Sequence, residues 1–193
     1  MVARLTPILI GVLALSGCGS EKHDRPLPKT VPIGRGPAHQ PPALSPAVRA
    51  GHPVGDMLCT TTDPPRYGVH VELFGDRKSA VLPAGIGVAP PWQGRRPYVT
   101  SGRCSYPLRT REPTGVVEVA SAGLTLGDLF TVWGQPLSPT RAGAFRGPVN
   151  VYVAGRRWTG DPRAIPLARH AQITIAVGGG VPIHRRYEFP PGL

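Results

Sequence analysis

Two arginines, Arg109 and Arg111, stand two residues apart in the stretch CSYPLRTRE that begins at Cys104. If this stretch is a strand, both side chains point to the same face, because strand side chains alternate with a period of two. Neighbouring guanidinium groups repel each other, so solvent, carboxylates or a bound anion must compensate them. The pair therefore predicts either a surface neutralised by Glu72 and Glu112 or a site for a phosphate or carboxylate.

A histidine is the third candidate for this ligand site. His70 lies in the alternating stretch GVHVELFGD, which the pattern predicts as a strand, and we expect it near Arg109 and Arg111. A lone strand histidine commonly serves structure through its hydrogen bonds, so that role stays open. An alternative is a degenerate metal centre of His70, Glu72 and His170, because imidazole and carboxylate groups both bind metal ions.

Soft ligands provide a second metal alternative, a copper site. Its members would be Met57, Cys59, His70 and Cys104. Nothing in their spacing forces these residues together, and three further histidines, His23, His39 and His52, are widely spaced. We therefore predict that the protein holds no metal and no other cofactor.

The sequence lacks the usual signatures of catalysis. It contains no G-x-S-x-G elbow, no phosphate-binding loop and no zinc motif. Ser101, Ser105 and Ser121 have no base beside them in the sequence. We predict that the protein is not an enzyme.

The first seventeen residues have the layout of an export signal. Arg4 precedes an apolar run from Ile8 to Leu15, which is too short to span a membrane stably. The following Leu-Ser-Gly-Cys resembles a bacterial lipobox, and this implies cleavage before Cys18 and a diacylglycerol on its thiol. Two or three acyl chains would hold the protein on the extracytoplasmic face of the cell membrane. An ordinary signal peptide with a chance cysteine is the alternative.

The cysteine count depends on this processing. Lipidation of Cys18 leaves Cys59 and Cys104, and two cysteines outside the cytoplasm most simply form a disulfide. We predict that this bond joins the end of the N-terminal segment to the strand that begins at Cys104.

Composition divides the chain into four parts. Residues 1–17 are the predicted lipoprotein signal peptide, and residues 18–65 are the lipidated cysteine and a proline-rich tether. The segment from 18 to 65 shows no apolar periodicity, so we expect it to be disordered or polyproline-like. Residues 66–180 form the predicted globular domain, and residues 181–193 form a C-terminal tail.

The domain shows mainly strand-like alternation. Val- and Ile-rich segments recur at residues 68–76, 114–121, 149–155 and 171–179. We expect residues 77–88 to be the hairpin partner of the first segment. In LTLGDLFTVWG, Thr125 can cap a helix that Gly134 ends, and the apolar positions have helical spacing: Leu126, Leu129, Phe130 and Trp133. We predict an α+β fold, mostly antiparallel β with one short amphipathic helix, grasp-like, with a β-sandwich as the alternative.

The chain is strongly basic. It has nineteen arginines, three lysines and eleven acidic residues, for a formal net charge of +11. The excess of arginine, with abundant Ala, Gly and Pro, resembles proteins of GC-rich actinobacteria. We expect the membrane as a partner through the N-terminal lipid, together with anionic envelope components or another protein. No nucleic-acid motif is present, and we predict no nucleic-acid partner.

Several stretches resemble a family of uncharacterised bacterial proteins that are secreted or attached to the membrane. YGVHVELFGDRK and the following VLPAGIGV resemble its strand H-x-H-x-H-L-x-I-F-V-x-G-K and the proline-alanine-glycine turn after it. CSYPLRTREPTGVVEVAS resembles its motif C-x-Y-x-L-H-T-H-D-x-x-G-V-I-H-V-E-S. The stretches LTLGDLFTVWGQPL and DPRAIPLARHAQITIAVG are also similar, so the resemblance runs from about Tyr67 to Gly178.

The departures from this family bear on function. The family's histidines imply a metal site, but here Arg109, Arg111 and Glu118 stand where three of them would be, and His70 keeps a histidine position. Arginine is always charged and only donates hydrogen bonds, so it is no ordinary metal ligand. We expect a lipid-anchored cell-envelope protein that acts as a non-catalytic binding or structural module. The alternatives are anion binding through Arg109 and Arg111, or degenerate metal binding through His70 and His170.

Overall fold

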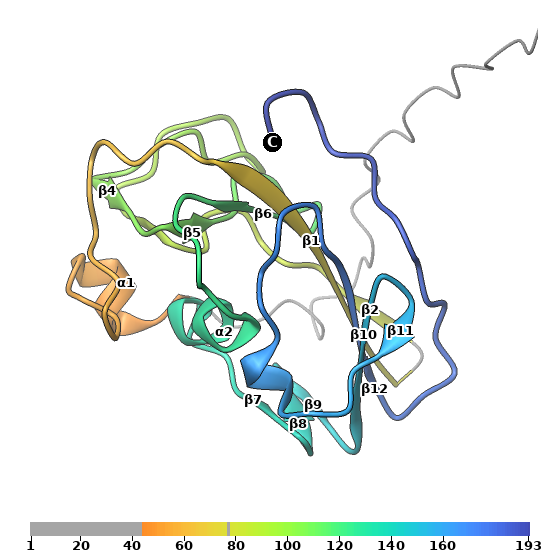
Figure 1. Cartoon of the computed structure of the whole chain (residues 1–193). Helices are drawn as coiled ribbons and strands as arrows, with labels where there is room; N and C mark the ends of the chain where they lie inside the picture. The colour runs from red at the N-terminus through yellow and green to blue at the C-terminus, as the bar shows by residue number, and fades with distance from the viewer. Residues whose placement is uncertain (1–43, 77) are drawn as a thin grey trace, which may run out of the picture.

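The computed structural model describes residues 44–76 and 78–193 (Figure 1). The predicted export signal, the predicted lipidation site at Cys18 and the first part of the predicted tether lie outside these residues. Within the described chain, no helix has the length and apolar character needed to cross a membrane.

Short strands make up most of the secondary structure. The helices are α1 (Pro46–Ala50) and α2 (Leu126–Trp133), with a 3-10 turn, η2 (Pro162–Ala164). The strands are β1 (Tyr67–Gly75), β2 (Lys78–Ala80), β3 (Val88–Ala89), β4 (Cys104–Ser105), β5 (Leu108–Arg109), β6 (Val116–Val119), β7 (Leu137–Ser138), β8 (Arg141–Ala142), β9 (Phe145–Arg146), β10 (Val149–Val153), β11 (Arg156–Arg157) and β12 (Gln172–Val177). Each segment that alternation predicted as a strand contains one.

The main sheet is open and has seven strands in the order β11-β10-β12-β1-β6-β5, with β2 also paired to β1. Its centre is a parallel pair, β1 with β12, and the other pairings are antiparallel. In the chain, α2 follows β6 and precedes β10, so it connects the two outer parts of the sheet. The α+β, mostly antiparallel prediction is confirmed, and this strand order is grasp-like. Smaller sheets, β3-β4 and β7-β8-β9, complete the fold.

One face of the sheet forms the core. Val69, Val71 and Leu73 alternate along β1 and are buried, and Ile173 and Ile175 do the same on β12. They belong to one apolar cluster with the buried side chains of α2, which are Leu126, Leu129, Phe130, Val132 and Trp133. Full burial of a side chain of this size stabilises the fold by roughly 1.5–3 kcal/mol.

The helix α2 has the ends that its sequence predicts. The Thr125 side chain accepts a hydrogen bond from the Asp128 backbone, and the Asp128 carboxylate accepts one from the Thr125 backbone. This capping box satisfies two amide groups that have no partner within the helix. Gly134 ends the helix in the left-handed conformation with φ 74°, which glycine adopts without steric cost.

The prediction of a disordered tether up to residue 65 is wrong for residues 44–65. Leu44, Val48, Val54 and Met57 are buried in the core cluster, and α1 packs against β3. Apolar periodicity did not reveal this folded segment, because α1 has five residues and its apolar side chains are sparse. Proline at its start and the cap from Ser45 hold this short helix, and tertiary contacts supply the rest.

The predicted disulfide is present between Cys59 and Cys104, with their Cα atoms 5.3 Å apart. It joins the N-terminal segment to the start of β4, and the two cysteines are 45 residues apart in the sequence. Closing a loop of this size stabilises a fold by about 4 kcal/mol in the chain-entropy model. Both sulfurs are therefore bonded to each other, which excludes them from the copper site considered above.

Candidate functional site

The face of the sheet opposite the core is polar and buried. We call it the polar face and define it by six buried side chains: His70, Glu72, Arg109, Glu118, Gln172 and Thr174. They alternate with the core residues of β1, β5, β6 and β12, so the same period of two that builds the core also collects them here. Buried polar groups require hydrogen-bond partners, and the polar face supplies them in two separate clusters.

The first cluster contains the arginine pair. Arg109 lies directly opposite Glu118 in the pairing of β5 with β6, and its Nε is 2.9 Å from Glu118 Oε2. Arg111 follows β5, and its Nε is 2.9 Å from Glu118 Oε1. One carboxylate therefore bridges two guanidinium groups, which places both on the same side of the sheet, as the spacing predicts.

The neutralising carboxylate is not the one that we expected. Glu72 bonds to other partners on β12 and the tail, and Glu112 is exposed. Glu118 pairs with the arginines because strand register sets it across from Arg109. The two arginine side chains differ in burial, with 4% of Arg109 and 38% of Arg111 exposed. Arg109 is thus fixed in the fold, whereas Arg111 reaches solvent.

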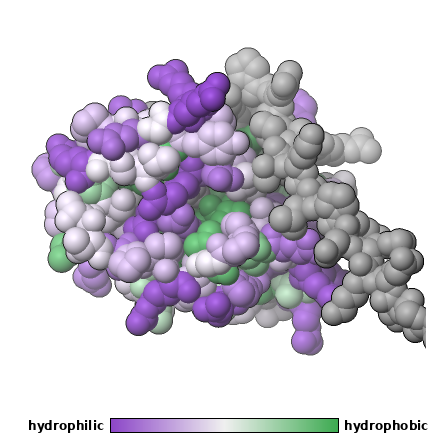
Figure 2. Space-filling model, turned by 90° about the horizontal axis from the view of Figure 1, so that it is seen from above, coloured by the Kyte–Doolittle hydropathy of each residue, from purple (hydrophilic) through white to green (hydrophobic). Residues whose placement is uncertain are grey.

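Both arginines line a hollow of about 460 Å³, which we call the arginine hollow. Its wall comes from the segments on either side of the disulfide, residues 60–65 and 100–105. A third arginine, Arg103, and one acid, Asp63, also line it. Six hydroxyl side chains complete the polar lining: Thr60, Thr61, Thr62, Thr100, Ser101 and Ser105. Seen from above, hydrophilic residues dominate the molecular surface, and apolar residues are confined to small patches (Figure 2).

The hollow has an excess of positive charge. Three guanidinium groups stand against two carboxylates, those of Asp63 and Glu118. Arg103 donates from Nη2 to the backbone oxygen of Arg49, 2.8 Å away, so its position is also fixed. The Thr60 hydroxyl is buried and has no hydrogen-bond partner within the described structure. This combination of fixed cations and hydroxyl groups suits an oxyanion.

The second cluster surrounds Glu72. Gln172 Nε2 and Thr174 Oγ1 each donate to Glu72 Oε2 at 3.0 Å, and His184 Nδ1 lies 2.8 Å from Glu72 Oε1. His70 Nδ1 lies 2.7 Å from Gln172 Oε1. The other ring nitrogen of this histidine, Nε2, is 2.9 Å from a backbone oxygen, that of residue 114. Burial lowers the pKa of His70, although its hydrogen bonds and the charge of Glu72 oppose that shift.

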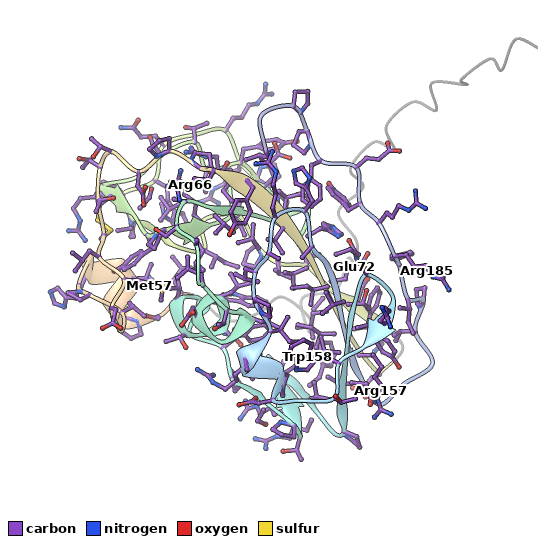
Figure 3. All side chains as sticks on the ribbon, in the orientation of Figure 1. Met57, Arg66, Glu72, Arg157, Trp158 and Arg185 are labelled. Atoms are coloured by element: carbon purple, nitrogen blue, oxygen red, sulfur yellow. A yellow bond between two sulfur atoms is a disulfide. The ribbon has the colours of Figure 1, made fainter. Side chains whose placement is uncertain are left out.

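The tail, residues 181–193, covers this second cluster. It contains no helix or strand and runs back beside the sheet (Figure 1). Figure 3 shows Glu72 on β1 with the tail residue Arg185 farther out on the same side. Tyr187 stacks on His70 with ring centres 3.8 Å apart. Burial, and secondarily the charge of Glu112, raises the pKa of Tyr187.

A second tail ring continues this stack. Phe189 contacts Tyr187 edge to face at 5.1 Å and stacks on His170 at 4.8 Å. Gly68 makes room for it, because a Cβ atom there would come within 2.7 Å of Phe189 Cδ1. The tail rings therefore lie between His70 and His170, two members of the alternative metal set. Among residues 44–76 and 78–193, no three His, Cys, Asp or Glu side chains gather closely enough to hold a metal ion.

The expected ligand site is thus divided. Arg109 and Arg111 both contact Glu118 and line the hollow. His70 lies on the same face of the sheet, but it belongs to the second cluster and does not line the hollow. Sequence reasoning did not predict the roles of Glu118, Arg103 and the tail. The sequence did single out Glu118, because it is the acidic residue in the otherwise apolar strand VVEV.

A scan against protein-family models and searches of curated proteins and solved structures found no match to this chain. The family resemblance described from the sequence remains a prediction, and the site must be interpreted from its own geometry.

Proposed function

We propose that this protein is a lipid-anchored, non-catalytic binding module of the cell envelope, and that the arginine hollow binds an anionic group of its ligand. The observation that carries the proposal is the excess of guanidinium over carboxylate groups in a hollow lined by hydroxyls. Phosphate and carboxylate are the anions that suit arginine's planar donor arrangement.

The arginine geometry leaves donors for a ligand. Arg109 and Arg111 each contact Glu118 through Nε, and a guanidinium has five N–H donors in all. Glu118 orients both groups before binding, which reduces the conformational entropy that a ligand must remove. It also keeps two neighbouring cations compatible with folding when no anion is bound.

Two features support a location outside the cytoplasm. The Leu-Ser-Gly-Cys stretch ending at Cys18 follows an apolar run, as in lipoprotein signals. The disulfide between Cys59 and Cys104 suits an oxidising compartment. Together they favour a folded domain held at the outer side of a membrane by acyl chains.

The test uses the mature chain with Cys18→Ser, titrated with inorganic phosphate and with acetate by calorimetry and NMR. We expect saturable binding of at least one anion, and a loss of tenfold or more in Arg111→Ala, which removes a half-exposed side chain. Arg146→Ala is the matched control, because Arg146 is exposed on β9 and does not line the hollow. Equal affinity in wild type and Arg111→Ala would contradict the proposal.

In cells, Cys18→Ser should move the protein out of the membrane fraction.

A further inference from the structure

A loop beside the arginine hollow exposes aromatic and basic side chains together. All eight residues from 91 to 98 are exposed, and we call this segment the aromatic–arginine loop. Trp92 and Tyr98 are each 46% exposed, which is unusual for such large apolar rings. Arg95 and Arg96 lie between them in the sequence and are also exposed.

Backbone hydrogen bonds hold the loop in shape. The amide of residue 100 donates to the Gln93 oxygen at 2.8 Å, and the Tyr98 amide donates to the Arg95 oxygen at 2.8 Å. The Trp92 indole N–H donates to the Val88 backbone oxygen at 2.8 Å. The indole can therefore enter an apolar medium without leaving an unpaired donor, and a loop already in shape loses little entropy on docking.

The surrounding sequence carries one sign of charge. From Lys78 to Arg111 the chain contains six lysines and arginines and no acidic residue. Three of these cations, Arg103, Arg109 and Arg111, line the neighbouring hollow. The loop therefore presents its rings within a basic region, and its partner must combine negative charge with an apolar layer.

The first helix, α1, lies close to the base of this loop. α1 packs against β3, and β3 ends one residue before Pro90 and the loop. Arg103 just after the loop donates to the Arg49 oxygen in α1. Figure 1 shows α1 and β4 on the same side of the molecule. The helix α1 thus flanks the base of the loop, and the described chain enters this helix at Ser45, beside Gly134 at the end of α2.

We infer that the aromatic–arginine loop docks on an anionic lipid surface. This inference rests on the proposed location at the membrane. Trp92 and Tyr98 enter the boundary between headgroups and acyl chains, where amphipathic rings are favoured, and Arg95 and Arg96 contact lipid phosphates. Each arginine near an anionic surface raises partitioning roughly fivefold, so the contact is reversible and depends on the anchor for lasting attachment.

The experiment measures vesicle binding by the mature chain with Cys18→Ser, which has no acyl chains of its own. Vesicles of phosphatidylcholine alone are compared with vesicles that also contain phosphatidylglycerol. We expect binding to the anionic vesicles, a blue shift of tryptophan fluorescence and a decrease with rising salt. Arg95→Gln with Arg96→Gln should weaken binding roughly 25-fold, and Trp92→Ala with Tyr98→Ala should weaken it roughly tenfold.

The controls separate the loop from the hollow and from general charge. Arg146→Gln with Arg156→Gln removes two exposed arginines outside the loop and should retain most of the binding. Arg111→Ala should lose phosphate binding and still bind vesicles. The inference is overturned if neutral and anionic vesicles bind equally, if neither binds, or if the Arg95 and Arg96 variant binds as wild type does. Because these two arginines are exposed, their variant tests the inference even if loss of Trp92 disturbs the loop.

Discussion

The polar face of the sheet has an open half and a covered half. In the open half, Arg109 and Arg111 line a hollow that solvent reaches, and both pair with Glu118. In the covered half, Tyr187 of the tail stacks on His70, and His184 of the tail contacts Glu72. Arg109 and Glu118 are as buried as these two residues, and the open half reaches solvent through Arg111. Both halves come from the same alternation, on β5 and β6 in the open half and on β1 and β12 in the covered half. The cover of the tail, and not the strand pattern, therefore distinguishes them.

The two carboxylates show what this difference means for binding. Glu72 accepts hydrogen bonds from Gln172 and Thr174 and contacts His184, so its carboxylate oxygens have partners within the fold. Glu118 faces two guanidinium groups and is outnumbered in charge. The covered half is complete without a ligand, whereas the open half has cationic donors left for one. This difference supports the proposal that a ligand binds in the open half, with a structural role for the covered half.

The largest expected effect comes from removing the carboxylate that pairs with both arginines of the open half. Glu118→Gln leaves the buried Arg109 without its carboxylate and beside Arg111, so we expect the free energy of unfolding to fall by about 3 kcal/mol. Phosphate affinity should rise at the same time, because a competing negative charge is gone. Chemical unfolding and calorimetry measure the two changes. Glu112→Gln is the control, since an exposed position should change stability by less than about 0.5 kcal/mol. A fall in both quantities would show that Glu118 orders the hollow more than it competes with the ligand.

A smaller effect is expected from removing the two tail rings that cover the other half. Tyr187→Ala with Phe189→Ala removes two half-buried rings, and we expect a loss of about 1–2 kcal/mol in unfolding free energy. Hydrogen exchange should rise in the tail while phosphate affinity stays unchanged. Gly68→Ala provides a matched variant, because its Cβ displaces Phe189 and leaves the tail sequence intact. Altered phosphate binding in either variant would mean that the two halves are coupled.

The smallest effect concerns pH. The folded-state pKa of His70 is lowered by burial, so the unfolded chain binds this proton more readily. The stability due to neutral His70 is complete above the unfolded pKa of about 6.5 and is lost as the pH falls toward the folded value, by at most about 1.4 kcal/mol per pH unit. Urea unfolding across this range measures the slope.

Several groups face His70 and must be separated from it in that measurement. Glu72 lies on the same strand, and His184 and Tyr187 approach from the tail. His70→Gln should flatten the pH dependence, and His184→Gln serves as the comparison. The tail variant that lacks both rings should also show a smaller slope, because His70 then regains solvent. Stability that rises as the pH falls below about 6.5 would contradict this account.

Much of the fold followed from local patterns in the sequence. Val69, Val71 and Leu73 alternate, and Thr125 and Gly134 mark the ends of α2, so these elements and the α+β class were predictable. The disulfide followed from the cysteine count. Each of these signals lies within one segment or needs no knowledge of strand order.

The candidate site was less predictable because it depends on register between distant segments. Arg109 and Arg111 were placed on one face correctly, but their partner is set by the pairing of β5 with β6. Tyr187 and Phe189 have no periodic context, so nothing local indicated that they cover His70. The packing of Val48 and Met57 was missed for the same reason. Apolar residues are sparse in this part of the sequence, so only their contacts with the core show that they are buried.

The parallel pairing of β1 with β12 has a consequence for how the molecule reaches its native state. The contact between His70 and Gln172 joins residues 102 positions apart, and the centre of the sheet cannot close until both segments have been synthesised. Such long-range pairing slows folding, because the entropy of closing the loop must be lost before native contacts form. A chain that folds late remains extended while it is being made, and that is the state in which a polypeptide is threaded across a membrane. The strand order thus suits the proposed destination: the central pair closes only after the C-terminal segment has followed the rest of the chain.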